Sequence, residues 1–287
     1  MNYNEPSIKK KREEVFSKKK RKQTTASAII FRIVLILICA VIVSGAGLLY
    51  GSFRGIIDSA PKEFSLAPKY SATIVYDDDN KQVQQLSDYS SNRIPVAYEQ
   101  IPDNLKNAFI SIEDERFYEH DGIDFKGILR ALWTDIRNGS TSQGASTLTQ
   151  QLIKNNVFEA GGETNIIAKV KRKIQEQYLA IIAEKKYNKE DILTNYLNTI
   201  NLGKGNLGVE AASKYYFGKS VNELTLSECA VLAGITKNPT FLNPVDYPED
   251  NDARRKLILK KMYQLNYISD TEYQSALEDK VYARIAN

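Results

Sequence analysis

The chain has 287 residues, 43% of them hydrophobic and 26% charged, which excludes a fully disordered or collagen-like protein and allows one sizeable domain with accessory segments. Its net charge of +4 is unevenly distributed: residues 1–32 hold ten Lys and Arg against three Glu, whereas the remaining 255 residues hold 29 basic and 32 acidic side chains. The basic character therefore belongs to an N-terminal tail, which either binds nucleic acid or flanks a membrane span on its cytoplasmic side.

The segment after the tail decides between these two interpretations. Residues 33–53 are 21 positions without a charge, about the length that a helix needs to cross a hydrocarbon core of ~30 Å. Five consecutive Lys and Arg at 18–22 precede the segment, and Arg54 follows it. The positive-inside rule predicts a single-pass protein of the cell membrane with a cytoplasmic N-terminus, and no nucleic-acid partner is expected. A cleaved signal peptide is the alternative, because residues 44–46 are small.

The chain is thus predicted to have four parts: a basic cytoplasmic tail (1–32), a transmembrane helix (33–53), an extracytoplasmic connector with a β hairpin (54–100) and the main domain (101–287). The two cysteines give no disulfide, because Cys39 lies in the span and Cys229 lies in an apolar helical run. The extracytoplasmic part must therefore be held together by its hydrophobic core, which this length can supply.

The predicted elements begin with the hairpin, with strands at 73–76 and 81–86 and a turn of acidic and Asn residues at 77–80. From residue 101 onward the apolar residues recur at helical spacing. A first helix carries Leu105, Ala108, Phe109 and Ile112, and a second stripe runs from Phe125 to Ile136. The second stripe is interpreted either as ordinary core or as a surface that rests on the bilayer. A Gly/Ser/Thr loop at 139–146 follows it.

The remaining elements are helical as well. A helix over 165–187 is predicted to have its apolar face at Val170, Ile174, Tyr178 and Ile181. Three later helices carry N-terminal capping signals, in which Ser, Thr or Asn is followed three residues later by Asp or Glu. These pairs are Asn188 with Asp191, Thr225 with Glu228, and Ser269 with Glu272. The fold class is therefore mainly α, with one small β element.

Three stretches contain residues suited to chemistry. Residues 111–122 place three acids after an apolar helix face, next to the only histidine, and a carboxylate against an apolar wall is suited to general acid or base catalysis. Residues 144–155 lead a hydroxyl-rich loop into a helix N-terminus, which exposes backbone donors to an anion or a sugar. On the 165–187 helix, Lys169, Arg172, Lys173 and Glu176 fall within about a 100° arc opposite the predicted apolar face. Taken singly, each stretch also fits a solvated or capped helix end.

Together with two later stretches, these segments resemble the signature motifs of the peptidoglycan glycosyltransferase domain shared by monofunctional transglycosylases and class A penicillin-binding proteins. The first motif is matched by Glu113, Asp114, Phe117, His120 and Gly122. The second is matched over 144–155, the third over 172–176, the fourth at 196–198, 203, 208–212 and 216–219, and the fifth over 224–239. The resemblance covers residues 73–275. One departure is Gln175, where the family usually has Lys.

The resemblance implies a lysozyme-like helical lobe with a smaller membrane-proximal lobe, and a transfer without a covalent enzyme intermediate. Lipid II and the growing glycan chain would be joined by a β-1,4 link with inversion and release of undecaprenyl diphosphate. Glu113 would be the general base and Glu176 would steady the leaving diphosphate, for which Mg²⁺ or Mn²⁺ is a candidate cofactor; no organic cofactor is expected. Lys154, Arg172 and Lys173 would neutralise the leaving group.

The resemblance also assigns substrate-binding positions. Ser146, Thr147, Gln150 and Gln151 would shape the cleft for sugar and phosphate. The other positions are Asp114, Phe117, His120, Asn155, Lys169 and Asn198. The membrane and other cell-wall synthesis proteins are the expected partners.

Three alternatives remain at this stage. The chain is the N-terminal transglycosylase part of a bifunctional class A penicillin-binding protein, or a lysozyme-like hydrolase that also uses two carboxylates, or a catalytically silent cell-wall scaffold. A hydrolase has no need of the cationic helix face, and a scaffold has no need of Glu113 and Glu176. The only Ser-x-x-Lys-like run considered, at 17–20, lies in the basic tail, so no β-lactam binding is predicted for these residues.

Overall fold

The computed structural model describes residues 5–68, 73–76, 82–86, 92–138, 144–158, 163 and 165–286. The chain divides into two compact units, Met1–Ser59 and Ala60–Asn287. The first unit contains a single helix, α1 (Glu5–Asp58). Within the described residues, its part Leu37–Asp58 is long and apolar enough to cross a membrane, with 22 residues and a mean hydropathy of 1.6. One N-terminal apolar helix was predicted, and α1 continues beyond the predicted span at both ends.

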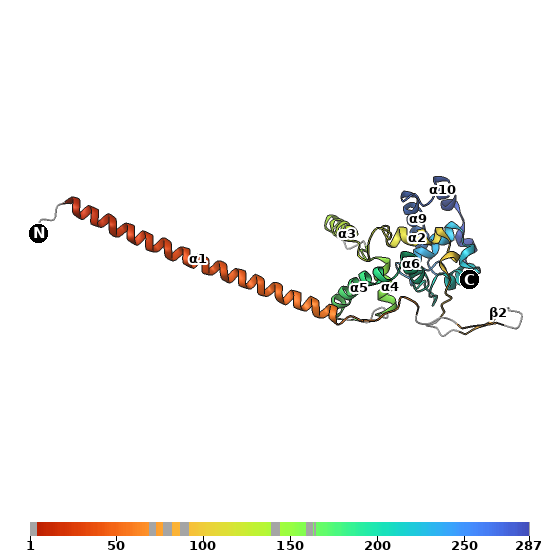
Figure 1. Ribbon diagram of the computed structural model, residues 1–287. Helices are drawn as coiled ribbons and strands as arrows, with labels where there is room; N and C mark the ends of the chain where they lie inside the picture. The colour runs from red at the N-terminus through yellow and green to blue at the C-terminus, as the bar shows by residue number, and fades with distance from the viewer. Residues whose placement is uncertain are drawn as a thin grey trace. The chain divides into compact units, whose positions relative to one another are not determined.

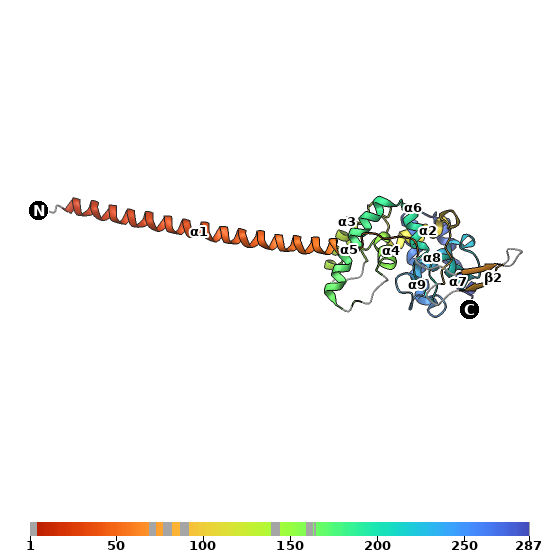
Figure 2. The same cartoon turned by 60° about the horizontal axis from the view of Figure 1, so that its bottom comes forward.

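The second unit is mainly helical, as predicted, and its helices gather around one hydrophobic core (Figures 1 and 2). The α-helices are α2 (Asp103–Glu113), α3 (Phe125–Asn138), α4 (Leu148–Asn156), α5 (Ile166–Lys186), α6 (Lys189–Leu197), α7 (Val209–Phe217), α8 (Leu226–Ile235), α9 (Pro248–Gln264) and α10 (Asp270–Glu278). Short 3-10 turns lie at η1 (Tyr98–Gln100), η2 (Val221–Glu223) and η3 (Val281–Arg284). The predicted lysozyme-like, two-lobe description stays a prediction.

The predicted hairpin is present as two antiparallel strands, β1 (Thr73–Tyr76) and β2 (Gln82–Leu86). Thr73 pairs with Leu86 at one end of the ladder, and the register shifts between Val75 and Tyr76. The predicted turn at 77–80 lies outside the described residues. The same is true of most of the loops at 139–146 and 159–165.

Helix α8 is the centre of the core. Every residue from Ser227 to Ile235 is buried, so this helix has no solvent-facing side. A helix that is apolar all round is stable only when it is covered by other elements, and α2 and α9 pack against it. Its N-terminus carries the predicted capping box of Thr225 and Glu228. The predicted caps of α6 and α10 are also present.

Helix α5 differs from its prediction in the face that it buries. The predicted apolar stripe is only half-buried: Val170 is 54% exposed, whereas Tyr178 packs against the edge of the core. The buried residues are Gln175, Glu176, Leu179, Ala180 and Ala183. The reason is that small Ala side chains allow close helix packing, and the carboxylate of Glu176 is compensated by neighbouring cations on the inward side.

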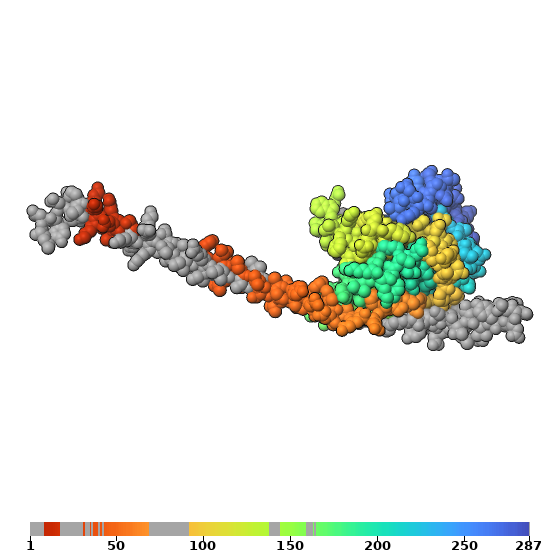
Figure 3. All heavy atoms as spheres, viewed as in Figure 1, coloured from red at the N-terminus to blue at the C-terminus, as the bar shows by residue number. Residues whose placement is uncertain are grey.

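Helix α3 has an apolar face that no other element of the described chain covers. Its large side chains Phe125, Leu129, Leu132, Trp133 and Ile136 are each between 53% and 79% exposed. In Figure 3 this helix, coloured yellow-green, protrudes from the rest of the folded unit. The core interpretation of this stripe was therefore wrong, because α3 faces the rest of the second unit with the side opposite to these apolar residues.

Candidate active site

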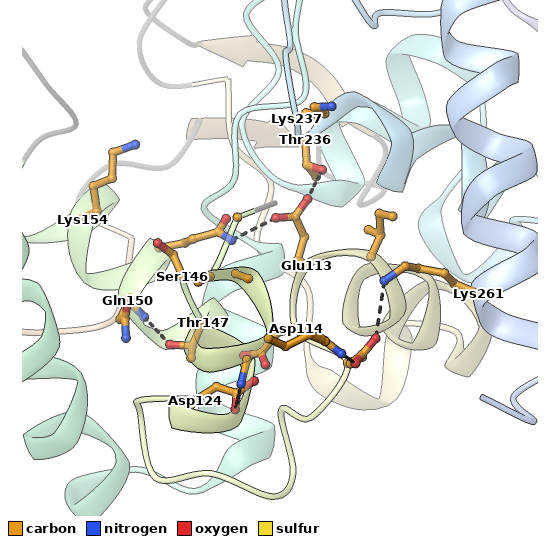
Figure 4. A pocket seen from close by; sticks show the side chains of 18 of the residues that line it. Glu113, Asp114, Asp124, Ser146, Thr147, Gln150, Lys154, Thr236, Lys237 and Lys261 are labelled. Atoms are coloured by element: carbon orange, nitrogen blue, oxygen red, sulfur yellow. Dashed lines mark hydrogen bonds and ion pairs between the residues drawn. The ribbon is translucent and has the colours of Figure 1, made fainter. Parts of the chain in front are cut away.

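A cavity of about 790 Å³ lies where α2 ends and α4 begins (Figure 4). It is bounded by α3 on one side, by α4 and α5 on another, and by α9 and the end of α8 on a third. Most of the predicted site residues line it. They are Glu113, Asp114, Ser146, Thr147, Gln150, Gln151, Lys154, Asn155, Lys173 and Glu176.

Glu113, the last residue of α2, is held at both carboxylate oxygens. Thr236 Oγ1 donates to Oε1 at 2.6 Å, and Gln151 Nε2 donates to Oε2 at 2.9 Å. The Gln151 amide is oriented in turn by Tyr196, whose hydroxyl donates to its Oε1 at 3.2 Å. Burial, and then the charges of Glu113 and Asp114, raise the pKa of Tyr196 well above its usual range, so its hydroxyl remains a donor. The carboxylate is thus aimed by a chain of neutral donors.

Asp114 and His120 form a buried pair beneath Glu113. The Gly122 backbone N–H donates to His120 Nδ1 at 3.2 Å, so His120 is assigned the tautomer that carries its proton on Nε2. That nitrogen lies 2.9 Å from Asp114 Oδ2, which also accepts from the Leu148 backbone N–H at 3.0 Å. The carboxylate therefore accepts from a backbone N–H at the start of α4 that has no partner within the helix, and its negative charge interacts favourably with the positive end of the helix dipole. This pair fixes α4 relative to Glu113.

The loop after His120 is fixed to α4 and α5 by Gly122. Thr147 Oγ1 and Gln150 Nε2 both donate to its carbonyl oxygen, at 2.9 and 3.1 Å. Gly122 has φ of +92°, and a Cβ there would lie 2.7 Å from the backbone of Ala180. Only glycine fits this close approach without strain. Thr147 and Gln150 thus line the cavity, but their side chains also donate hydrogen bonds that hold the Gly122 loop in place.

The α5 side of the cavity carries the cations. Lys173 Nζ lies 3.2 Å from Glu176 Oε2 and donates to Ser146 Oγ at 2.7 Å and to Gln150 Oε1 at 3.2 Å. Arg172 pairs with Glu176 and lies 3.0 Å from Glu163. Since the Glu176 side chain is only 1% exposed, these two cations are what stabilise its charge.

The Glu176 carboxylate is already paired with cationic side chains. Arg172 and Lys173 already occupy both oxygens of the Glu176 carboxylate. Among the described residues, no group of three or more His, Cys, Asp or Glu is arranged to hold a metal. The donor set around Glu176 is therefore that of a salt-bridged carboxylate, and the Mg²⁺ or Mn²⁺ cofactor stays a prediction.

Five predicted site residues do not line the cavity: Phe117, His120, Lys169, Arg172 and Asn198. Phe117 is fully buried, with Lys189 Nζ 4.5 Å above its ring. Asn198 holds the segment before η1, accepting from the Val96 N–H at 3.0 Å and donating to the Val96 carbonyl at 2.9 Å. Two of the five contact lining residues directly: His120 pairs with Asp114, and Arg172 pairs with Glu176. Lys169 is exposed.

The wall formed by α9 and the end of α8 was missed by the sequence reasoning. It contributes Thr236, Lys237, Arg254, Leu257 and Lys261. Thr236 and Lys237 fall inside the fifth motif, so that motif was a usable signal, whereas nothing in the charged pattern of α9 marks Arg254. The Arg254 Nε is buried without a hydrogen bond in the described structure, and burial lowers the pKa of this guanidinium while Glu113 opposes the shift.

Glu115 connects α3 to the opposite wall. Its carboxylate pairs with Arg130 of α3 and lies 3.4 Å from Lys261 Nζ of α9. Next to it, Arg116 and Asp124 form an ion pair of 2.5 Å. Glu115, two residues after Glu113, thus forms ion pairs with helices on two sides of the cavity.

Comparison with known proteins identifies the family. The family model for "Transglycosylase" matches residues 79–263, more than half of the chain. The chain therefore belongs to the transglycosylase family, as its motifs predicted.

Its relatives include much longer proteins. Penicillin-binding protein 1A of Clostridium tetani is 47% identical over 214 residues, covering 71% of this chain and 26% of that protein. Penicillin-binding protein 1A of Haemophilus influenzae is 44% identical over 209 residues, covering 73% and 24%. The chain spans about a quarter of the length of these curated relatives. A crystal structure of the Haemophilus influenzae protein matches with a TM-score of 0.41 and 26% identity, covering 76% of this chain and 22% of that one.

Proposed function

We propose that this chain is a peptidoglycan glycosyltransferase that polymerises lipid II into β-1,4-linked glycan strands, as the transglycosylase part of a class A penicillin-binding protein or of a close relative. The observation that carries the proposal is Glu113, a carboxylate oriented by Thr236 and Gln151 in a cavity whose α5 side is cationic. A base and an anion-binding wall in one cavity fit a sugar transfer with a diphosphate leaving group.

In this reaction the 4-hydroxyl of the acceptor GlcNAc attacks the anomeric carbon of the donor MurNAc. The hydroxyl proton passes to Glu113 as the new C–O bond forms. The bond to the diphosphate breaks with inversion, and its electron pair leaves with undecaprenyl diphosphate. Lys154 and Lys173, which line the cavity, neutralise the charge that grows on that group. Glu176 holds Lys173 and Arg172 in place.

The test is polymerisation of labelled lipid II by detergent-solubilised protein. We expect wild type to build glycan strands and Glu113→Gln to lose at least roughly 100-fold in rate, because general-base catalysis contributes about 10²–10⁴-fold. The matched control is Glu119→Gln, the same change in an exposed side chain six residues later. Release of reducing ends from finished glycan would instead indicate a hydrolase, and an active Glu113→Gln variant would contradict the assigned base.

We also propose that the protein is anchored by α1 with its N-terminus in the cytoplasm, and that the apolar face of α3 enters the bilayer surface. The support is the apolar segment Leu37–Asp58 and the exposed row from Phe125 to Ile136. A lipid-linked substrate must be reached at the membrane, and an amphipathic helix with large apolar side chains binds there. The orientation is checked by adding protease to sealed right-side-out vesicles, in which a cytoplasmic basic tail should be protected from cleavage.

A further inference from the structure

The two groups that hold Glu113 are chemically different. Gln151 presents an amide NH₂ to Oε2, and this group only donates. Thr236 presents a hydroxyl to Oε1, and a hydroxyl both donates one proton and accepts (Figure 4). The partner at Oε1 therefore suits an ionised and a protonated carboxyl alike, whereas the partner at Oε2 suits only an unprotonated oxygen.

Thr236 has a second acceptor within reach. Its Oγ1 lies 2.9 Å from the carbonyl oxygen of Ala233, three residues earlier in α8, as well as 2.6 Å from Glu113 Oε1. The single hydroxyl proton can point to either acceptor by rotation about the Cβ–O bond, and no heavy atom has to move. Thr236 is only partly exposed and follows the fully buried end of α8, so its position is fixed by the core.

We propose that Thr236 is a positioning residue for proton transfer to Glu113. It donates to Oε1 while Glu113 is ionised; once Oε1 has taken the proton, it turns to the Ala233 carbonyl and accepts from the new O–H. The inference rests on the proposed function, in which the acceptor's proton passes to Glu113 as its oxygen bonds to the donor carbon and the diphosphate leaves. Oε1 is then the oxygen that receives the proton, because Gln151 offers Oε2 a donor only.

Loss of the Thr236 hydroxyl acts mainly through orientation. A carboxylate held by Gln151 alone is free to rotate about its last bond, which moves Oε1 away from the acceptor hydroxyl. Proton transfer requires the heavy atoms within about 2.6–3.2 Å, and a misplacement of ~1 Å costs roughly 100-fold in rate. The effect belongs in kcat, since the sugars and phosphates meet other residues of the cavity.

The experiment compares initial rates of lipid II polymerisation for the full chain in detergent. Thr236→Val keeps the shape and removes the hydroxyl, and we expect kcat to fall roughly 10- to 100-fold with KM within about two-fold. Thr236→Ser keeps the hydroxyl and should stay within about three-fold of wild type. The matched control is Thr240→Val in the same loop, which is exposed and does not line the cavity.

Several results would overturn the inference. These are a wild-type kcat for Thr236→Val, an equal loss in Thr236→Ser, or an effect confined to KM. Thr236→Ala, which adds no bulk, replaces the Val variant if the latter unfolds.

A second measurement separates this inference from the proposed function. The infrared carboxylate band of Glu113, identified as the difference between wild type and Glu113→Gln, should shift in Thr236→Val and stay in place in Thr236→Ser. An unshifted band removes the inferred contact even when polymerisation is normal. A wild type that makes no glycan contradicts the proposed function, while the band still decides on Thr236.

Discussion

The carboxylate of Glu176 illustrates how single residues hold this site together. It is buried on the inward face of α5 and is compensated by Arg172 and Lys173. Burial of a charge is costly unless it is paired and hydrogen-bonded, so these cations and the carboxylate stabilise one another. The arrangement fixes the Lys173 ammonium at the cavity surface, where a diphosphate would meet it.

At the residue scale we predict that Glu176→Gln lowers the free energy of unfolding by roughly 1.5–3 kcal/mol, the range for loss of hydrogen bonds to a charged group. The loss stays moderate because Arg172 retains Glu163 and Lys173 retains Ser146. Denaturant unfolding measures it. Glu163→Gln, which removes the more exposed partner of Arg172, should cost less than about 1 kcal/mol. The reverse order of the two variants would contradict this account.

At the scale of elements, α3 is attached on one side and uncovered on the other. Its body side is joined to the cavity through the Glu115–Arg130 and Arg116–Asp124 pairs. Its outer side presents large apolar residues without a covering element in the described structure. If this face enters the bilayer surface as proposed, α3 connects that surface with the residues that follow Glu113.

The only tryptophan of the chain, Trp133, lies on this outer face, so its fluorescence reports on α3 alone. We expect its emission to shift to the blue and to be quenched by brominated acyl chains when the protein is reconstituted into vesicles. Leu129→Glu with Ile136→Glu should abolish the quenching, because a charge is costly at the depth of the acyl chains. Lys126→Glu, a charge change at an exposed residue of the same helix, is the control. Unquenched wild-type emission would contradict membrane contact.

The attachment of α3 should also depend on pH. Burial alone would raise the pKa of Glu115, but Arg130 and Lys261 outweigh it and the net pKa is lowered. Likewise, burial would raise the pKa of Asp124, but Arg116 and the Gly127 N–H outweigh it and lower the pKa. A carboxyl group with a lowered folded-state pKa contributes stability above its unfolded pKa of about 4, and this stability is lost as the pH falls through the folded value.

We therefore expect limited proteolysis in the segment 115–138 to be constant between about pH 7 and 5 and to increase below about pH 4. Glu115→Gln with Asp124→Asn removes both titrating groups. That double variant should show the high cleavage rate already at neutral pH and little further change. An acid-stable protease such as pepsin suits the lower range. Cleavage that rises with increasing pH in wild type would show that the sign is wrong.

At the scale of the whole molecule, the hydrophobic-core residues that the structure describes all belong to the second unit, from Ala60 onward. We expect the fragment 60–287 to fold with nearly the thermal midpoint of the full chain and to polymerise lipid II in detergent. It should be retained less on sealed vesicles, because the apolar segment Leu37–Asp58 is removed. Failure of this fragment to fold, by circular dichroism, would show that the first unit contributes to stability.

Local signals in the sequence were sufficient for much of the fold. The capping pairs at α6, α8 and α10 predicted where these helices begin, because a cap is a contact over three residues. The hairpin strands also agree, within one residue at the start of β2. The inward face of α5 was missed, since periodicity favours Val and Ile, whereas the contacts of this helix select Ala180 and Glu176.

The site residues that the sequence predicted are all residues of the family motifs or lie near them in the chain. Glu113, Gln151 and Lys173, which the family resemblance assigned to the site, line one cavity. Thr236 contacts Glu113 across 123 positions of chain, and this proximity depends on how α8 packs against α2. Asn198, another motif residue, makes two hydrogen bonds to the backbone of Val96 and so has a structural role. A motif can mark such a residue, but no local pattern gives the residue that it contacts.

The Glu176 carboxylate has a consequence for product release. Without Glu176, the charge of Lys173 at the cavity surface and that of Arg172, which does not line the cavity, would both be uncompensated. The two cations would then retain the departing diphosphate after the sugar has moved on. Glu176 pairs with both cations. In the proposed reaction it would compete with the diphosphate for them, so the pocket would attract the leaving group and still release it. In the proposed reaction, turnover of successive lipid molecules would depend on that compromise, and an anionic inhibitor would have to displace Glu176 from its partners to bind tightly.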